Sequence, residues 1–220
     1  MKNKLIKLFS ISINKTILFN FKFIRGFRKF LFPIHVFRGI RFARIGSRKE
    51  VWISPRVKKI EIGCPGSFRI SRTGFWNVSK DSRVEFLGGN IYLSCGIQLY
   101  VGSKAKLKIG NNFKINSNSM IICSNSIDIG DDVACGWENE FLDGDGHSIS
   151  KNGQVLPKTG KISIGNHVWI ASRCCLLKGA SVPNNTVIAF GAVISKLLNE
   201  QNSIYGLNNK RLSSIDNWYY

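Results

Sequence analysis

One histidine, His147, directly follows two carboxylates and two glycines, in a run that the sequence does not repeat elsewhere. Asp143 and Asp145 carry the carboxylates, and a glycine follows each of them. A carboxylate bonded to one imidazole nitrogen fixes the tautomer and raises the basicity of the other nitrogen. That nitrogen could take the proton of a hydroxyl group, so His147 is the candidate general base and Asp145 or Asp143 its orienting group. The alternative is an ordinary exposed turn, which uses the same residue types.

The other histidines and the cysteines are weaker candidates. His167 occupies a turn position of a repeat, and His35 lies in a basic segment. The cysteines show neither Cys-x-x-Cys spacing nor an accompanying histidine pattern, so no metal site is expected. Small buried hydrophobic residues in a reducing compartment account for them better. They are Cys64, Cys95, Cys123, Cys135, Cys174 and Cys175.

The elements that must position these residues follow a six-residue repeat. Aliphatic residues recur at this interval without a break at Ile164, Ile170, Leu176, Val182, Ile188 and Ile194. Position five of each unit is mostly small, and holds Val168, Cys174, Ala180, Thr186, Ala192 and Leu198. A helix would need a period of about 3.6 and a half-buried strand a period of about 2. The interval predicts a solenoid in which three short strands close each triangular coil and stacked coils bury the aliphatic column.

The repeat extends upstream and is interrupted once. The same interval links Ile109, Ile115, Ile121 and Ile127 and, after a slip, Ile129, Cys135 and Phe141. Solenoids usually place insertions on their binding face, so the break after Phe141 is the expected active-site insertion. Alternating segments at 51–62 and 84–101 predict further, less regular coils. We expect an arm at 1–49, a solenoid domain at 50–198 with an insertion at about 142–161, and a tail at 199–220.

The arm at 1–49 differs in composition from the rest. It contains thirteen basic residues, no acidic residue and nine of the fifteen phenylalanines of a chain whose net charge is +19. Basic residues interleaved with apolar ones fit a helical segment at an anionic membrane surface, and lysines and arginines interrupt every run that could span. No signal-peptide pattern is present, so we expect a cytoplasmic protein peripheral at the inner face of the bacterial membrane. An RNA-binding arm and a cap on the first coils are the alternatives.

The segment Ile162-Ser163-Ile164-Gly165-Asn166-His167-Val168-Trp169-Ile170-Ala171-Ser172, preceded by the His147 run and followed by regular hexads, resembles the hexapeptide-repeat acyltransferases. The similarity is closest to the O-acetyltransferases that act on sugars and bacterial surface polysaccharides, and covers about residues 105–212. The resemblance implies an all-β, left-handed parallel β-helix assembled as a homotrimer, with active sites between subunits. It also implies acetyl-CoA as acyl donor and no metal.

The resemblance assigns roles residue by residue. His147 matches the catalytic histidine, and either Asn116 or Asn118 matches the acceptor-binding asparagine, with Trp137 also on the acceptor side. The positions that contact coenzyme A in the family are Ser172, Phe190, Ser195, Lys196 and Lys210. The sequence departs from the family at Val182-Pro183-Asn184-Asn185, at Phe190 and at 206–210, which affects the contacts to the adenine end more than the chemistry.

We therefore expect direct transfer of an acetyl group to a sugar hydroxyl of a surface glycan or its lipid-linked precursor, with no covalent acyl-enzyme. A small soluble acceptor, such as serine or a nucleotide-linked amino sugar, is the alternative within the enzymes. A non-catalytic scaffold or binding protein is the alternative of another class. A β-helix carbonic anhydrase would need three histidines on zinc, and the solenoid holds only His147 and His167.

Overall fold

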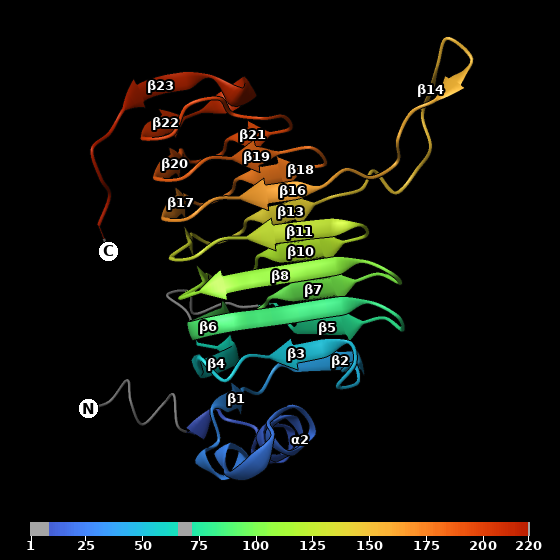
Figure 1. Cartoon of the computed structure of the whole chain (residues 1–220), viewed down its shortest axis with the longest axis vertical. Helices are drawn as coiled ribbons and strands as arrows, with labels where there is room; N and C mark the ends of the chain where they lie inside the picture. The colour runs from blue at the N-terminus through green and yellow to red at the C-terminus, as the bar shows by residue number, and fades with distance from the viewer. Residues whose placement is uncertain (1–8, 66–71, 220) are drawn as a thin grey trace.

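The computed structural model describes residues 9–65 and 72–219 of the chain. Short strands form a three-sided prism of stacked coils, with a helix at one end and an antiparallel strand at the other (Figure 1). Among the described residues, no helix has the length and apolar character needed to span a membrane. Along the prism, successive strands lie on different sides, and the strands of neighbouring coils pair in parallel.

Three parallel faces make up the prism. Face I holds β1 (Ile34–Val36), β4 (Val57–Cys64), the end of β6 (Arg83–Ser94), β9 (Lys114–Ile115), β12 (Ala134–Cys135), β17 (Val168–Ile170), β20 (Thr186–Ile188) and β22 (Ser203–Tyr205). Face II holds β2 (Ile40–Arg44), β5 (Gly74–Val78), β7 (Gln98–Val101), β10 (Met120–Cys123), β13 (Glu140–Leu142), β18 (Cys175–Leu177) and β21 (Val193–Ile194). Face III holds β3 (Val51–Ile53), the start of β6, β8 (Lys106–Asn111), β11 (Ser126–Ile129), β16 (Ile162–Ile164) and β19 (Ser181–Val182).

The predicted aliphatic column is the core of the prism. Every hexad position from Ile164 to Ile194 is buried, as is every position-five residue from Val168 to Leu198. The earlier block is buried as well, and the strand register stacks Leu99, Ile121, Phe141 and Leu176 in one line on face II. The prediction of parallel, three-sided coils is confirmed, and so are the less regular coils upstream. The left hand stays a prediction from the family resemblance.

The prism begins inside the segment assigned to the arm. Strand β1 pairs with β4, and β2 pairs with β5, so the parallel faces reach back to residue 34 instead of starting at 50. Within the described part of 1–49, the helical elements with given bounds are α2 (Ile13–Phe23) and the 3₁₀ turn η1 (Gly26–Leu31). The portion of the predicted arm at 1–8 lies outside the described residues.

Helix α2 closes the N-terminal end of the prism. Phe19 and Phe23 enter the core, where Phe19 lies 5.8 Å from the ring of Trp76. Asn20 is fully buried, and its amide donates to Ile34 O at 2.6 Å and accepts from Ile34 N at 3.1 Å. Likewise, the Thr16 hydroxyl donates to Val36 O and accepts from Val36 N. These two side chains bond the edge of β1 that faces away from β4, where the described chain adds only the antiparallel bridge between Ile11 and Phe37.

The C-terminal end is closed differently. Strand β23 (Arg211–Ser214) pairs antiparallel with β22 and ends the parallel stack. The tail then folds back along the prism, where Trp218 is buried against the ring of His167 at 4.4 Å and 14°. The Trp218 indole N–H donates to His167 O at 2.9 Å, and His167 Nε2 lies 2.7 Å from Asn217 Oδ1. His167 is therefore a structural residue that holds the tail.

Candidate active site

The break in the hexads is a loop that stands away from the prism. It leaves β13 at the edge between faces II and III, carries a short hairpin, β14 (Ser150–Lys151) and β15 (Gln154–Val155), and returns at β16 (Figure 1). We call residues 143–161 the active-site loop. Its base is fixed by the bridge between Gly144 and Thr159 and by backbone bonds from Asp145 N to Lys158 O and from Gly160 N to Asp143 O. The hairpin itself is exposed to solvent.

The structure separates His147 from its two predicted carboxylate partners. Asp143 is buried, and its carboxylate accepts hydrogen bonds from the backbone N–H groups of Ser124 at 2.6 Å and Asn125 at 2.8 Å. Asp145 forms an ion pair with Lys178, whose ammonium group also donates to Pro157 O at 2.8 Å. His147 is exposed and forms no hydrogen bond or ion pair within the part of the chain that the structure describes. Both carboxylates thus hold the base of the loop.

A second group of predicted residues lines the edge between faces I and II, which we call edge I/II. The Ser172 hydroxyl accepts from Trp137 N at 3.2 Å, and Gly191 N donates to Ser172 O at 3.0 Å beside Phe190. Asn116 and Asn118 occupy the same corner on an earlier coil, where Asn118 Oδ1 accepts from Arg72 N at 3.0 Å. The structure therefore brings the acceptor-side residues together with Ser172 and Phe190. The hexad register of the sequence places them on successive coils of one corner.

Edge I/II also contains two charged residues that the sequence analysis did not name. Arg173 Nε donates to Glu138 Oε2 at 2.9 Å, and its guanidinium lies 5.7 Å from the centre of the Phe190 ring. Both residues line a hollow of 380 Å³ that includes Asn118. Their corner position in the hexads was the available signal, but corner residues are exposed in any solenoid, so the position alone did not single them out.

The remaining predicted coenzyme A residues lie elsewhere. Ser195 and Lys196 follow β21 at the edge between faces II and III, edge II/III, which also carries the active-site loop. Ser195 N donates to Asn209 Oδ1 at 3.0 Å, which places Lys210 on the adjoining end of the prism. Lys196 and Lys210 are exposed and have no acidic partner among the described residues. Two unpaired ammonium groups fit the phosphates of a coenzyme A molecule.

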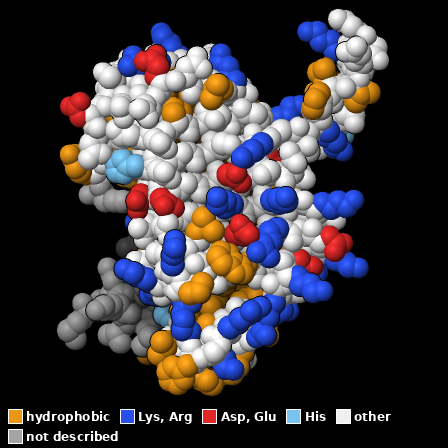
Figure 2. All heavy atoms as spheres, viewed as in Figure 1, with side chains coloured by type: hydrophobic (Ala, Val, Ile, Leu, Met, Phe, Trp, Pro, Cys, Tyr) orange, Lys and Arg blue, Asp and Glu red, His pale blue; other side chains and the backbone are white. Residues whose placement is uncertain are grey.

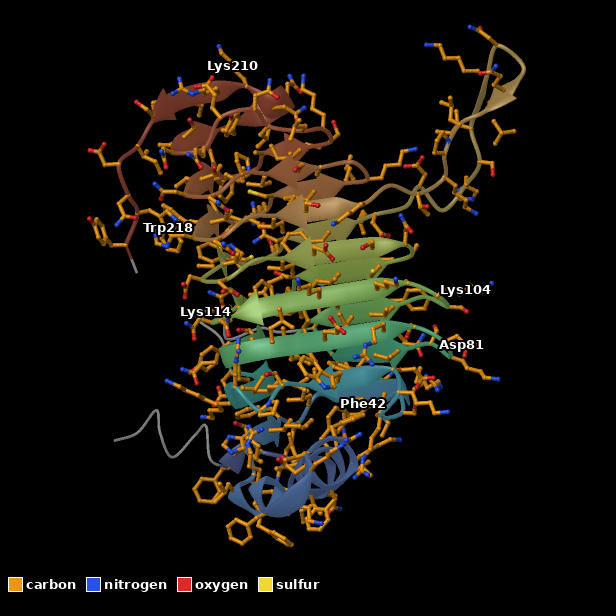
Figure 3. All side chains as sticks on the ribbon, viewed as in Figure 1. Phe42, Asp81, Lys104, Lys114, Lys210 and Trp218 are labelled. Carbon is orange, nitrogen blue, oxygen red and sulfur yellow. The ribbon has the colours of Figure 1, made fainter. Side chains whose placement is uncertain are left out.

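The two groups of candidate residues occupy different edges of one prism. The active-site loop leaves edge II/III, on the side where Asp81 and Lys104 project in Figure 3, whereas Asn116, Trp137 and Ser172 belong to edge I/II. No contact between His147 and edge I/II is present in the described chain. Within the described chain the two groups therefore do not form one site.

Two further features limit the chemistry. Burial raises the pKa of the Cys123 thiol, with Asp143 as a second cause, and burial also raises the pKa of Cys135 and Cys174. Burial, followed by the charge of Glu140, raises the pKa of Cys175 to about 11. These thiols stay protonated near neutral pH and are poor nucleophiles. The described residues contain no group of three or more side chains that could hold a metal ion.

A further open hollow lies on face III. This groove of 810 Å³ runs beside Trp52, Arg56 and Lys108 and contains none of the predicted site residues. Asp128 on its floor is paired with Lys161 Nζ at 2.6 Å. The groove is therefore separate from the candidate active site.

The chain is similar to curated proteins of related size. It is 32% identical over 114 residues to galactoside O-acetyltransferase from Escherichia coli K12, which covers 50% of this chain and 54% of that protein. It is 24% identical over 148 residues to an uncharacterized 24.8 kDa protein in the cps region of Klebsiella pneumoniae, which covers 65% of that protein. The aligned part thus spans little more than half of the first relative's length. No protein-family model matches the chain.

Solved structures share the fold. A mutant of AntD, an N-acyltransferase from Bacillus cereus in complex with dTDP and coenzyme A, superposes with a TM-score of 0.52 at 12% identity, covering 83% of this chain and 82% of that one. The polySia-specific acetyltransferase NeuO superposes with a TM-score of 0.51 at 15% identity, covering 83% and 89%. The first of these relatives and both solved structures are acyltransferases, which confirms the resemblance to acyltransferases that the sequence showed.

Proposed function

We propose that this chain is an acetyl-CoA-dependent O-acetyltransferase that modifies a hydroxyl group of a sugar in a glycan, with His147 as general base. The observation that carries the proposal is the imidazole of His147, which is exposed and has no partner among the described residues, on a loop that stands away from the β-helix. A histidine without a structural role inside its own chain is available to a substrate. The similarity to galactoside O-acetyltransferase supports the choice of a sugar hydroxyl as acceptor.

Direct transfer is the reaction that the side chains favour. Acetyl-CoA would supply an activated acyl group. Lys196 and Lys210 would bind the phosphates of the coenzyme A molecule, and Ser172 and Phe190 of edge I/II would contact the rest of it. His147 takes the proton of the acceptor hydroxyl as the hydroxyl oxygen attacks the thioester carbonyl carbon. The carbon–sulfur bond then breaks, and the protonated imidazole returns the proton to the leaving coenzyme A thiolate. The raised thiol pKa values disfavour a covalent acyl-cysteine, because the thiolate is the nucleophilic form.

A cyclic homotrimer is part of the proposal. In such a trimer, edge II/III of one subunit faces edge I/II of the next, so each junction combines a His147 loop with an Asn116 and Trp137 corner. The separation of these groups on one prism supports this arrangement, because an isolated chain does not bring them together.

The orienting group of His147 differs from the sequence expectation in this proposal. Asp143 and Asp145 are committed to Ser124, Asn125 and Lys178 within the chain. We therefore propose that they position His147 indirectly, by fixing the base of the active-site loop. The imidazole partner would come from the neighbouring subunit.

The proposal is tested by incubating the purified full chain with acetyl-CoA and a panel of acceptors. The panel contains a galactoside, an oligosaccharide, serine and a nucleotide-linked amino sugar, and release of free coenzyme A thiol is followed for each. We expect thiol release and an O-acetylated product with a sugar acceptor, identified by its NMR spectrum. Transfer to serine or to an amino group would replace the sugar-hydroxyl assignment. If no acceptor causes release of coenzyme A thiol, the result would favour a non-catalytic binding protein.

A further inference from the structure

The outer surface of the N-terminal cap is apolar and basic at the same time. Large apolar side chains of α2, η1 and the residues just before them are exposed, with Phe27 at 75% and Leu31 at 68%. We call this set the cap surface; it comprises Phe9, Ile13, Ile17, Leu18, Phe21, Phe27, Phe30 and Leu31. Figure 2 shows hydrophobic side chains gathered at the lower end of the molecule, with lysines and arginines beside them.

The apolar residues of the cap surface are not needed by the core. Helix α2 already buries Phe19 and Phe23 on its inner side, together with the hydrogen-bonding side chains of Thr16 and Asn20. Its outer side repeats apolar residues at Ile13, Ile17 and Phe21, one helical turn apart. The inner apolar side of α2 packs on the core, so its outer apolar side is available to bind a partner. A contiguous exposed apolar patch of this kind marks an interaction surface.

The cap surface is held in a fixed arrangement. The rings of Phe21 and Phe30 meet edge to face at 5.6 Å, and Phe27 lies 5.8 Å from Phe30. Lys29 Nζ lies 5.3 Å from the Phe21 ring and 5.2 Å from the Phe30 ring. Below them, Arg28 donates to Val57 O and Arg48 to Phe21 O, which ties both helical elements to the prism. A surface ordered in advance loses little conformational entropy when it binds.

The charge around the cap surface selects the partner. Residues 9–49 include no acidic residue, and Lys22, Arg25 and Lys29 have no acidic partner within the described chain. A second copy of the same end would bring two basic rims together, which opposes self-association. An anionic lipid surface instead neutralises the rim while the aromatic rings enter the boundary between headgroups and acyl chains.

We infer that the cap surface docks the prism end-on onto an anionic membrane, with the Phe21, Phe27 and Phe30 rings inserted and Lys22, Arg25 and Lys29 on the lipid phosphates. The cap thus has two sides with different tasks, since its inner side closes the core and its outer side binds lipid. Docking of this kind would bring the enzyme to an acceptor hydroxyl on a glycan held at the membrane. Only this identification of the acceptor rests on the proposed function. The docking itself requires neither acetyl-CoA nor an acceptor.

The first test measures co-sedimentation of the full chain with lipid vesicles. We expect strong binding to phosphatidylcholine vesicles that contain phosphatidylglycerol and weak binding to phosphatidylcholine alone. Replacing two inserted rings in the double variant Phe27→Ser and Phe30→Ser should weaken binding by at least about tenfold, because each ring transfers apolar area out of water. The matched control is Tyr219→Ser, which removes an exposed aromatic ring far from the cap and should leave binding unchanged.

The second test separates charge from apolar insertion. The triple variant Lys22→Gln, Arg25→Gln and Lys29→Gln should lose about a hundredfold in binding to the anionic vesicles, since each basic residue near the surface contributes several-fold. The control variant Lys80→Gln, Lys104→Gln and Lys114→Gln changes the net charge equally on other parts of the prism and should bind normally. Thermal melting of each variant checks that the cap still closes the core.

Three outcomes would overturn the inference. Folded ring and charge variants that still bind the vesicles would locate the contact elsewhere. A concentration-dependent association of the wild type that the ring variant loses would assign the cap surface to a second copy of the chain. Displacement of the protein from vesicles by RNA at low concentration would assign it to nucleic acid. Because these vesicles carry no glycan, an inactive protein that binds them would count against the proposed reaction and not against docking.

Discussion

At the scale of single residues, the surroundings of the two solenoid histidines give them different tasks. His167 is stacked under Trp218 and bonded to Asn217, so its ring holds the C-terminal tail. His147 has no such contact within the described chain and is exposed on the active-site loop. The sequence alone favoured His147 because of its neighbouring aspartates, yet the structure commits those aspartates to backbone N–H groups and to a lysine. Spacing along the chain identified the histidine but not the contacts of its neighbours.

Replacing His147 with Ala should lower turnover by about 10² to 10⁴, the usual contribution of a general base, and leave the melting temperature unchanged. His167→Ala is the matched control, since it should lower stability by about 1 kcal/mol through loss of the stacked ring. Steady-state kinetics with acetyl-CoA and thermal unfolding of both variants give the comparison. A His147→Ala protein that keeps its turnover would remove this residue from the mechanism.

At the scale of elements, the hexads were predictable and the contacts that seat the cap were not. A strict six-residue interval identifies buried positions without further information, because each coil repeats the environment of the previous one. The cap obeys no repeat, and its key residues are polar. Asn20 and Thr16 look like surface residues in the sequence, but they complete the open edge of β1, a contact that appears only when the strand is in place.

Asn20→Ala should destabilise the protein by about 2 to 4 kcal/mol, because it leaves a buried N–H and a buried C=O of Ile34 without partners. Asn14→Ala, on the exposed side of the same helix, should change stability by less than about 0.5 kcal/mol. Urea unfolding followed by circular dichroism measures both values. Equal stability of the two variants would show that the helix does not close the β1 edge in solution.

Glu50 lies in the first turn between faces II and III and should make the free energy of unfolding depend on pH in the acid range. Burial raises the pKa of Glu50, but hydrogen bonds from Arg44 and Ser47 outweigh burial and lower that pKa to about 2. A carboxyl whose pKa is lower in the folded state stabilises the protein above its unfolded pKa of about 4.3 and loses that effect as pH falls toward 2. Glu50→Gln should therefore be about 2 kcal/mol less stable than wild type at pH 7, with the difference shrinking below about pH 4. Urea unfolding at several pH values tests this, and a constant difference would contradict it.

At the scale of the whole molecule, the candidate site is divided between two edges of the prism. The structure places Asn116, Trp137 and Ser172 at equivalent corners of successive coils, but no sequence pattern shows which corner faces a neighbouring subunit. Trimer assembly and its shared sites stay proposals drawn from the family resemblance and supported by this separation.

If each active site is shared between two subunits, two inactive variants that assemble into the same trimer should regain activity. His147→Ala removes the loop side, and Asn116→Ala, with Trp137→Ala as a second choice, removes the corner side. When the two are co-expressed in equal amounts, about a quarter of the junctions in mixed cyclic trimers pair two intact sides. We expect activity to recover toward that fraction, while mixing the separately folded proteins should restore none. Co-assembled trimers that stay inactive would place the complete site within one chain.

The regular stacking of coils also sets a length. Four strand spacings separate β2 from β13 on face II, and with the helix of the cap they put the start of the active-site loop about 30 Å from the cap surface. A protein docked on its cap would select acceptors by their distance from the membrane, since only hydroxyl groups held at that height above the lipid would reach His147. Short glycans anchored in the same membrane would then escape modification, and each coil added or removed below β13 would move the selected height by about 4.8 Å.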